Sequence, residues 1–570
     1  MDRMEPVDLN AAADAYAATP LLNCLLREAA EPVGPAESAQ ASESAGTSES
    51  AGTSESAGTS ESAGTSESAG TSESAGTSES AGASGGPGAA VHRLRGSGRL
   101  LRVHGGRRPV RPELCTADGW QPLGHTELVK LTAGELLRYT GIPNDELPVE
   151  IDDSRNAIAA LLAARAVAEP PADPYLLSEQ SLVMGHPHHP APKARGGGPA
   201  GSWLPYAPEA HARFPLVFLG LREDQVAEEG GPAAADAVDS LVDALDGPRP
   251  PAGYRLLPAH PWQLDLVGSR SPVREAFADG RLLRLGESRL PAWPTASIRT
   301  LYVPRPGADL FVKFSLDVRI TNDVRRLWRH DLLKLRRTDA AVEAGFGALR
   351  RTGPDAADAA WLADRGYRTA GFAFEELAVL VRDGLHAHAA PGSTPLLAAA
   401  LAEGYAGSPL ASTADPAAWW RAYLRLVVPP VLELFARHGI VLEAHLQNTL
   451  VAVDAAGLPA QALFRDAEGV KLVPDLDRPA AWQRLVYCLV VNHLAEIAGA
   501  LAERHPDISP FVWPAVREEF LRYDAAYGLP EIAELLAAPA LPAKTNLLLR
   551  WTGADGADAR YLPLPNPLRG

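Results

Sequence analysis

The stretch EAHLQNTLVAV (residues 443–453) places a group of polar side chains immediately before a short apolar run. The run TLVAV has the composition of a buried strand. A helix is predicted to end at Gly439, because glycine is the preferred residue just past a helix end. The segment between them is therefore expected to be a polar loop, suited to phosphates or a metal ion, with four candidate residues: Glu443, His445, Gln447 and Asn448.

The sequence then turns back on itself. DAAGLP (454–459) has the composition of a turn, AQALF reads as a returning strand, and Asp466 stands just beyond it. Asn448 and Asp466 thus flank the two ends of one predicted hairpin and are expected to converge. Protein kinases use such a layout to hold Mg²⁺ on the phosphates of ATP. The HRD and DFG sequences of kinases are missing. Binding of Mg-ATP is therefore predicted without a requirement for phosphoryl transfer to a substrate.

Two further segments carry residues that suit phosphate binding. WPTASIRTLYVP (293–304) places Ser297, Arg299 and Thr300 close together, and arginine binds phosphate through two parallel hydrogen bonds. The same residues would also suit an exposed strand edge. LFVKFSLDVRITNDVRRLWR (310–329) places Lys313 on an apolar strand, as nucleotide-binding enzymes do. The competing interpretation is that Lys313 extends to solvent and that the basic residues after it begin a helix. Thr321 and Arg325 follow in the same segment.

Two histidine–proline motifs precede them. GHPHHPAPKARGG (185–197) holds His189 and Lys193 in a loop framed by proline and glycine, with His186, His188 and Arg195 nearby. The prolines favour an extended backbone that presents these side chains to an anion such as a carboxylate. A zinc site and a plain surface loop are the alternatives. In PAHPWQ (258–263), a structural and a functional role are equally compatible with His260 and Trp262.

Composition excludes some classes of function. The chain has 570 residues, 70 acidic against 53 basic, and a net charge of −17, which argues against a nucleic-acid-binding protein. Three cysteines without paired spacing, and no secretory signal pattern in MDRMEPVDLN, favour a reduced, cytoplasmic setting. The most apolar window, 485–502, contains Asn492, His493 and Glu496 and is predicted to be a buried helix, not a membrane span.

The pattern along the chain predicts an α+β protein of three parts. Residues 1–170 are expected to form a helical and mixed domain, 171–350 a β-rich domain, and 351–570 a mostly helical domain, with helical patterns prevailing after 355. Tandem ESAGTS hexapeptides run from Glu43 to Ser84 and contain no large apolar residue. A disordered insertion at about 35–90 is therefore expected in the first domain.

Five motifs in this order (GHPHHPAPK, HPWQ, SIRTL, KFSLDVRITNDVR and EAHLQNTLV) resemble the IucA/IucC siderophore synthetases, which work without a nonribosomal peptide synthetase. The likeness covers nearly the whole chain outside the insertion. It implies an open hand of thumb, fingers and palm, with a palm similar to a protein-kinase lobe. It also implies that a carboxylate is adenylated with Mg-ATP and then attacked by an amine or hydroxyl group. Two features depart from the family pattern: the loop ending KARGGG and the ESAGTS insertion.

The resemblance also assigns roles to residues. It implies catalytic functions for Arg299, Lys313, Arg325 and His445. The implied ATP contacts are Ser297, Arg299, Thr300, Lys313, His445, Gln447 and Asn448. The implied carboxylate contacts are His189, Lys193, Thr321, Arg325 and His445. The implied Mg²⁺ ligands are Asp466, Asn448 and Glu443.

The N-terminal LLNCLLRE (21–28) looks more like members that act on free citrate. Citrate or a related acid is thus the expected first substrate, and an amine, amino acid or hydroxyl compound the second, in a homodimeric enzyme. The alternatives are a synthetase that acts on a later citryl or succinyl hydroxamate intermediate, a kinase-like phosphotransferase, and a non-catalytic citrate or siderophore binder.

Overall fold

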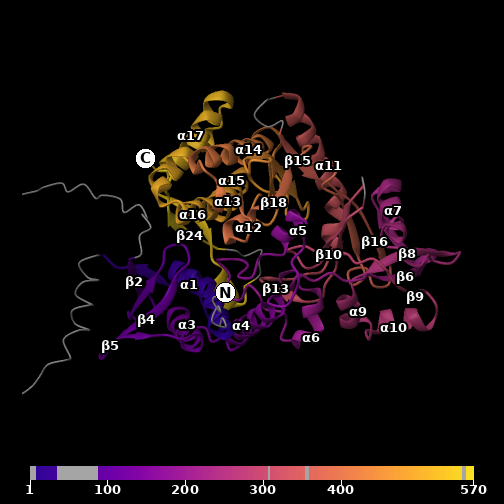
Figure 1. The fold of residues 1–570 in the computed structure, drawn as a ribbon, viewed down its shortest axis with the longest axis horizontal. Helices are drawn as coiled ribbons and strands as arrows, with labels where there is room; N and C mark the ends of the chain where they lie inside the picture. Colours follow the sequence, from indigo (N-terminus) through magenta and orange to yellow (C-terminus); the bar gives the residue numbers. More distant parts are fainter. Residues whose placement is uncertain (1–7, 35–87, 306–307, 353–357, 555–559, 570) are drawn as a thin grey trace, which may run out of the picture.

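The structure is a computed structural model that describes residues 8–34, 88–305, 308–352, 358–554 and 560–569. The predicted insertion at 35–90 lies outside the described residues up to residue 87. Figure 1 shows the N-terminal part at the lower left, the middle of the chain at the right, and the C-terminal helices above the N-terminal part. Helices and strands are mixed along the chain, as an α+β fold requires.

The N-terminal part packs helices against an antiparallel sheet of five strands in sequence order. Leu21 and Leu25 from the first helix meet Leu101 and Leu114 from the sheet in one buried cluster. The first helix begins after Asp8, whose carboxylate accepts hydrogen bonds from the backbone of the first turn. The elements are α1 (Leu9–Glu28), β1 (Ala30–Pro32), β2 (Ala89–Leu94), β3 (Leu100–His104), β4 (Val110–Thr116), β5 (Gly119–Pro122), α3 (His125–Thr140), α4 (Glu146–Arg165) and α5 (Pro174–Glu179).

A helix from the far end of the chain completes this N-terminal core. Leu547 and Trp551 of α19 (Asn546–Thr552) belong to the same buried cluster as the first helix. Glu28, at the end of α1, accepts hydrogen bonds from the backbone N–H groups at the start of α19, over 2.8 to 3.0 Å. Burial raises the pKa of the Glu28 carboxyl to about 7, although these donors favour its charged form. The two ends of the chain therefore form one folded unit.

The middle of the chain is rich in strands, as predicted. A three-stranded sheet, in the order β8-β6-β9, lies beside a six-stranded antiparallel sheet, in the order β10-β11-β12-β17-β16-β7. The three-stranded sheet comprises β6 (Val217–Arg222), β8 (Tyr254–Ala259) and β9 (Leu282–Glu287), and the six-stranded sheet β7 (Val226–Glu229), β10 (Trp293–Pro294), β11 (Thr300–Val303), β12 (Leu310–Phe314), β16 (Asp364–Ala370) and β17 (Val379–Asp383). The helices here are α6 (Ala200–Trp203), α7 (Gly231–Asp239), α8 (Leu241–Ala244), α9 (Pro261–Val267) and α10 (Ser271–Ala278), and a small β13 (Arg319–Ile320) and β14 (Asp323–Val324) hairpin follows.

The C-terminal part contains the predicted hairpin. β20 (Thr449–Val453) and β21 (Pro459–Arg465) pair in antiparallel fashion, and α14 (Pro416–His438) ends at Gly439, which has a left-handed backbone. The sheet is completed by β15 (Ala359–Leu362) and β18 (Thr394–Leu397) in the order β15-β21-β20-β18. The remaining elements are α11 (Arg329–Thr352), α12 (Ala398–Glu403), α13 (Pro409–Ser412), β19 (Ile440–Val441), β22 (Lys471–Leu472), α15 (Arg478–Val486), α16 (Ala495–Arg504), α17 (Ser509–Tyr527), α18 (Pro530–Ala537), β23 (Ala540–Lys544) and β24 (Tyr561–Pro565).

The prediction that helices prevail after residue 355 is wrong for residues 359–397, which hold β15 to β18. Alanine and leucine favour a helix locally, but almost all residues of these strands are buried by neighbouring strands and helices. Tertiary pairing outweighs a weak local propensity at such positions. The six-stranded sheet consequently takes strands from both sides of residue 350.

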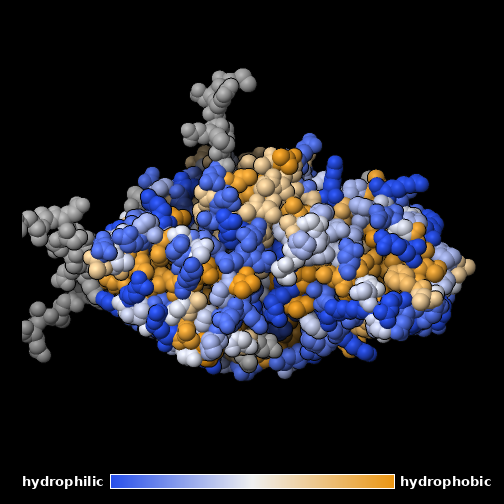
Figure 2. Space-filling view, turned by 90° about the horizontal axis from the view of Figure 1, so that it is seen from below, coloured by the Kyte–Doolittle hydropathy of each residue, from blue (hydrophilic) through white to orange (hydrophobic). Residues whose placement is uncertain are grey.

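One described segment, Arg478–Arg504, is long and apolar enough to cross a membrane by length and composition alone. It consists of α15, a π-helical stretch (Tyr487–Leu494) and α16, and most of it is buried inside the fold. On the face drawn in Figure 2, hydrophilic residues interrupt the hydrophobic ones along the whole length. The segment therefore packs as a core helix, as the sequence predicts.

Candidate active site

The six-stranded sheet places Lys313 on one face of β12. Its neighbours Val312 and Phe314 point the other way, into an apolar core, as alternation in a strand requires. Thr300 lies directly opposite Lys313 on β11. Arg382 on β17 lies opposite Phe311, two residues before Lys313, so its side chain lies on the same face. Three polar side chains from three neighbouring strands thus share one surface.

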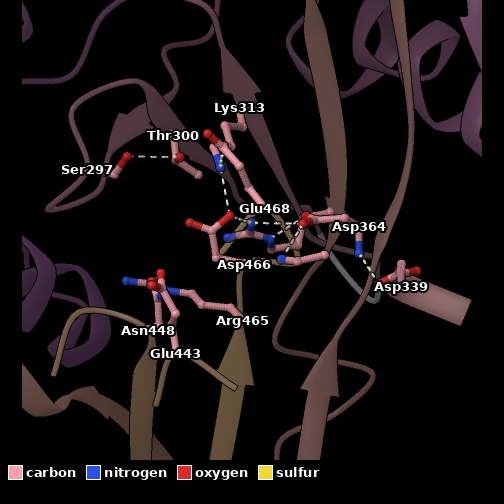
Figure 3. A network of polar contacts seen from close by, with 12 residues as sticks. Ser297, Thr300, Lys313, Asp339, Asp364, Glu443, Asn448, Arg465, Asp466 and Glu468 are labelled. Carbon is pink, nitrogen blue, oxygen red and sulfur yellow. Dashed lines mark hydrogen bonds and ion pairs between the residues drawn. The ribbon is translucent and has the colours of Figure 1, made fainter. Parts of the chain in front are cut away.

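A network of ion pairs connects this surface to the hairpin (Figure 3). Lys313 Nζ lies 2.7 Å from Asp466 Oδ1 and 2.7 Å from Glu468 Oε2. Arg299 donates to Glu468 Oε2 at 3.2 Å and to the carbonyl oxygens that follow β14. Arg382 donates to Asp466 Oδ1 at 3.1 Å and, at 2.6 Å, to the fully buried Asp364.

The network is electrically balanced, with three cations and three carboxylates. Burial raises the pKa of the Asp466 carboxyl, but Lys313 and Arg382 outweigh that effect and hold the pKa well below its usual range. The pKa of Glu468 is also lowered, because Lys313 and Arg299 outweigh its burial. Both carboxylates are therefore charged at neutral pH.

The loop 443–448 is held by Arg465 and by a contact between its own residues His445 and Asn448. Arg465, at the end of β21, donates to the Gln447 carbonyl at 2.9 Å and forms a bidentate pair with buried Glu179 of α5, at 2.6 and 3.3 Å. Within the loop, the Asn448 amide nitrogen lies 3.3 Å from His445 Nε2. Burial lowers the pKa of the His445 imidazole, which is therefore neutral at pH 7.

These groups line one pocket of about 220 Å³. It contains most of the residues predicted for the site: Lys193, Ser297, Arg299, Thr300, Thr321, Arg325, His445, Gln447, Asn448 and Asp466. Of the three others, Lys313 contacts the lining residue Asp466 directly. Glu443 forms an ion pair with Arg484, and its Oε2 lies 3.9 Å from His445 Nε2. His189 Nε2 lies 3.2 Å from Asn322 Oδ1.

Backbone geometry is unusual at the same place. Of the six non-glycine residues with positive φ in the described chain, Ile298, Thr321 and Asp466 line the pocket, with φ of 58°, 60° and 82°. Such conformations cost about 1–3 kcal/mol each and persist where the surroundings impose them. Strain of this kind concentrates at functional sites, which supports the assignment of this pocket as the active site.

The histidine–proline loop is stabilised mainly by contacts within the protein. Lys193 is buried and pairs with Glu209 at 2.5 Å, and Arg195 shares that carboxylate at 2.9 Å. His188 lies 3.0 Å from Glu496. Among the described residues, no three histidine, cysteine, aspartate or glutamate side chains are grouped as metal ligands. Burial lowers the pKa of His189 to about 3, so its ring is neutral.

His260 of the HPWQ motif lies in the core and does not line the pocket. Its ring packs edge-on against Tyr206 and Phe214, with centroids 5.2 and 4.9 Å away, and Trp262 stacks on Tyr206. The structure thus gives this motif a packing role next to the site.

The sequence prediction missed several residues of the network. Glu468 lies only two positions after Asp466, and that spacing could have indicated a second carboxylate. Arg382, in the apolar run LAVLVRDG, carries the same signal as Lys313: one cation within a buried strand. The positions of Glu179 and Arg108, in contrast, depend on the tertiary fold, which brings Arg108 to the pocket and Glu179 to the lining residue Arg465.

Comparisons with known proteins identify the family. A model described as the IucA/IucC family matches residues 174–403, and one described as ferric iron reductase FhuF-like transporter matches residues 417–559. The rhizobactin siderophore biosynthesis protein RhbC of Rhizobium meliloti is 30% identical over 469 residues, which cover 73% of this chain and 78% of that protein. The L-2,3-diaminopropanoate–citrate ligase of Staphylococcus aureus is 28% identical over 466 residues, 74% and 78% of the two chains.

Solved structures share the fold. The ATP-bound aerobactin synthetase IucA of Klebsiella pneumoniae superposes with a TM-score of 0.70 at 22% identity, covering 84% of this chain and 95% of that one. The petrobactin biosynthesis protein AsbB of Bacillus anthracis gives 0.67 at 19% identity, covering 82% and 88%. The sequence likeness over most of both chains, together with the shared fold, shows that this chain belongs to the IucA/IucC family.

Proposed function

We propose that the protein is an ATP-dependent ligase of siderophore biosynthesis, which activates a carboxylate of citrate as an acyl-adenylate and joins it to an amine. The observation that carries this proposal is a single pocket that combines the Lys313–Asp466 network with an arginine, Arg325, that has no carboxylate partner among the described residues. The names of relatives agree with it, because they include citrate ligases that use diaminopropanoate, D-ornithine or spermidine. The ATP-bound relative supports nucleotide binding at this fold.

Arg325 is the group that we assign to the acid. It is half-buried, and its Nη2 donates to the Ile320 carbonyl at 2.7 Å and to Thr321 Oγ1 at 2.5 Å. No carboxylate of the described chain lies within ion-pair distance of it, and burial lowers the pKa of its guanidinium. A buried cation without a counter-charge is stabilised by an anionic ligand. A carboxylate of citrate satisfies that requirement and can accept two parallel hydrogen bonds.

The phosphates of ATP fit the neighbouring surface. Ser297, Arg299 and Thr300 present donors there, and the Thr300 hydroxyl donates to Ser297 Oγ at 3.2 Å. With the acid held beside them, its carboxylate oxygen attacks the α-phosphorus and pyrophosphate leaves. The charged groups that face the phosphates stabilise the charge that develops, an effect worth several kcal/mol in preorganised sites. No nucleophilic side chain is required.

In the second step, the amine nitrogen attacks the acyl carbon, AMP leaves and the nitrogen loses a proton. We assign His445 to accept that proton, because the imidazole lines the pocket and burial keeps it neutral. The Asn448 amide nitrogen, 3.3 Å from His445 Nε2, orients the neutral ring, and this hydrogen bond opens when Nε2 takes up the proton.

Two carboxylates of the network, Asp466 and Glu468, are suited to hold a magnesium ion. Asp466 and Glu468 are both held by Lys313, and the amide nitrogen of Asn448 faces His445, which leaves its oxygen available. Mg²⁺ prefers such oxygen ligands together with substrate phosphates, and it would neutralise phosphate charge there. Glu443 pairs instead with Arg484. We therefore propose Glu468 in place of Glu443 as the second carboxylate.

We also propose that the three parts of the chain, 1–170, 171–350 and 351–570, act as thumb, fingers and palm around the pocket. Lining residues come from all three, including Arg108, Arg299 and Asn448. The hairpin with its flanking Asn448 and Asp466 supports a kinase-like palm.

One experiment separates this proposal from its alternatives. The protein is incubated with citrate, MgATP and hydroxylamine, and the nucleotide products and any hydroxamate are measured. Citryl hydroxamate with equal amounts of AMP and pyrophosphate is expected. ADP and phosphate would establish a phosphotransferase instead, and turnover only with another acid would overturn the choice of citrate. Arg325→Ala should abolish citrate-dependent turnover yet reduce ATP affinity less than Arg299→Ala does.

A further inference from the structure

The turn between β3 and β4 brings two arginines from the N-terminal sheet to the pocket. Arg107 is neutralised there: it pairs with Glu496 and with Glu503, at 2.8 Å each. Arg108 is not. Its Nη2 donates to the backbone carbonyls of Ala402 and Glu403, at 2.9 and 2.5 Å, and its buried Nε has no hydrogen-bond partner.

This arrangement sets Arg108 apart from most cations of the pocket. Within the described chain, each of the others except Arg325 has a carboxylate within ion-pair distance: Arg107, Lys193, Arg195, Arg299, Arg382 and Arg465. Burial and the neighbouring Arg107 lower the pKa of the Arg108 guanidinium, and no carboxylate of the described chain lies within ion-pair distance of it. The pocket therefore contains two arginines that are available to bind an anion, Arg325 and Arg108. They come from different parts of the chain.

An acidic group lies beside Arg108. The Glu403 carboxylate is half-buried and accepts hydrogen bonds from the backbone N–H groups of Met184 and Gly185, at 2.8 and 3.1 Å. No cation of the described chain lies within ion-pair distance of it, and burial raises its pKa. Arg108 and Glu403 both line the pocket, yet their side chains do not form an ion pair with each other. A positive and a negative group that lie close together, neither of them in a direct ion pair within the described chain, are complementary to a zwitterion.

We propose that Arg108 and Glu403 select the second substrate, which is an amino acid with an additional amine. Arg108 binds its carboxylate, Glu403 binds its ammonium group, and the other amine remains free to react. The inference rests on the proposed ligase function and narrows the second substrate to amines that carry a carboxylate. It assigns a specificity role to the basic turn Gly105–Pro109, which the first substrate does not require.

The test compares matched pairs of amines that differ only in the carboxylate: 2,3-diaminopropanoate with 1,2-diaminoethane, and ornithine with 1,4-diaminobutane. The assay uses the full-length enzyme with citrate and MgATP. In the pair that the enzyme uses better, kcat/KM should be about 10- to 100-fold higher for the amino acid than for the diamine. The reason is that a charge-assisted hydrogen bond contributes about 1.5–3 kcal/mol. Arg108→Gln should reduce this ratio to about one, and Arg108→Lys should restore part of it.

Arg99→Gln is the matched control. It removes one positive charge from the same basic segment, but Arg99 is exposed and does not line the pocket, so the ratio should stay as in the wild type. Equal use of a diamine and its amino acid by the wild type would overturn the inference. So would a raised KM for citrate in the hydroxylamine assay of Arg108→Gln, which would assign Arg108 to the acid. Absence of any citryl hydroxamate from the wild type would instead refute the ligase function itself.

Discussion

At the scale of single residues, the site depends on which charges are paired and which are left open. Lys313 lies between two carboxylates, Asp466 and Glu468, while Arg325 has only carbonyl and hydroxyl partners. The paired group suits a nucleotide with its metal, and the unpaired one suits an acid. The sequence indicated Lys313 and Asp466 because each stands out in an apolar strand or at a hairpin end. Their partners were not predictable, because spacing along the chain does not fix which side chains meet.

Asp466→Ala and Asn448→Ala are expected to impair the use of MgATP far more than the binding of citrate. Each removes an oxygen from the proposed metal site, and Mg²⁺ tolerates poor geometry badly. A loss on the order of 100-fold in kcat/KM for MgATP is expected, with a smaller change in citrate affinity measured by calorimetry. The exposed Asp507→Ala serves as the control. Near-normal activity of both variants at low Mg²⁺ would contradict the metal assignment.

His260→Phe is expected to flatten the pH dependence of stability. Burial lowers the pKa of His260 to about 3, so above pH 6.5 the neutral ring contributes its full stability. As the pH falls below 6.5, the unfolded chain takes up a proton that the folded one refuses, and stability is lost. The loss amounts to about 1 kcal/mol at pH 5.5.

Between pH 7.5 and pH 5.5, the thermal unfolding midpoint of the wild type should therefore fall more than that of the variant. Phenylalanine keeps the ring packing against Tyr206 and Phe214 but does not titrate. Glu28 has the opposite sign, since its raised pKa favours the folded state at low pH, but it contributes equally to both proteins. Parallel pH profiles would show that His260 is not the titrating group.

At the scale of elements, the site lies where two sheets meet. β12 and β17 provide the cations Lys313 and Arg382 from one sheet, and the β20–β21 hairpin is flanked by Asn448 and Asp466 in the other. The hairpin was predictable because a turn sequence separates two apolar runs. Strands such as β15 (AAWL) and β18 (TPLL) were not, because these short sequences become extended only when neighbouring strands bury them. The local sequence pattern therefore predicts strands that are joined by a clear turn sequence. It does not predict strands whose extended conformation depends on pairing with distant segments.

Arg382→Met should destabilise the junction of the two sheets. It leaves the fully buried Asp364 without its cation, although the Ala467 N–H still donates to it. Breaking a buried pair from one side costs about 3–5 kcal/mol. The midpoint of urea unfolding should fall accordingly, and adding Asp364→Asn to the same chain should recover part of the loss. An additive double variant would show that the two residues do not interact.

Deletion of residues 40–84 should leave folding and turnover nearly unchanged. The segment leaves after β1 and returns at β2, and these strands pair directly, Ala30 with Leu94 and Pro32 with His92. A short connection can therefore join them. Shortening a loop also lowers the free-energy cost of bringing its two ends together, by about 0.6 kcal/mol for each halving of its length. Differential scanning calorimetry and the hydroxamate assay check this, and a lower melting temperature or rate would show that the repeats contribute to the fold.

At the scale of the whole molecule, one pocket takes its lining from segments as far apart in sequence as Arg108 and Glu496. The ordered motifs predicted the family and most of the lining. They could not predict Arg108, because its significance arises only when the N-terminal sheet approaches the C-terminal helices. The general rule is that motifs indicate the chemistry of a site, while contacts between distant segments determine its selectivity.

The contact between Glu28 and α19 has a consequence for how the chain is made. A ribosome releases the N-terminal helix first, but Leu547 and Trp551, which complete its apolar core, are synthesised only about 518 residues later. Until then, the N-terminal helices and sheet have an open hydrophobic surface, a condition that invites aggregation and the binding of chaperones. A premature stop codon before residue 546 would thus destabilise the N-terminal part of the protein as well as remove the segment that follows.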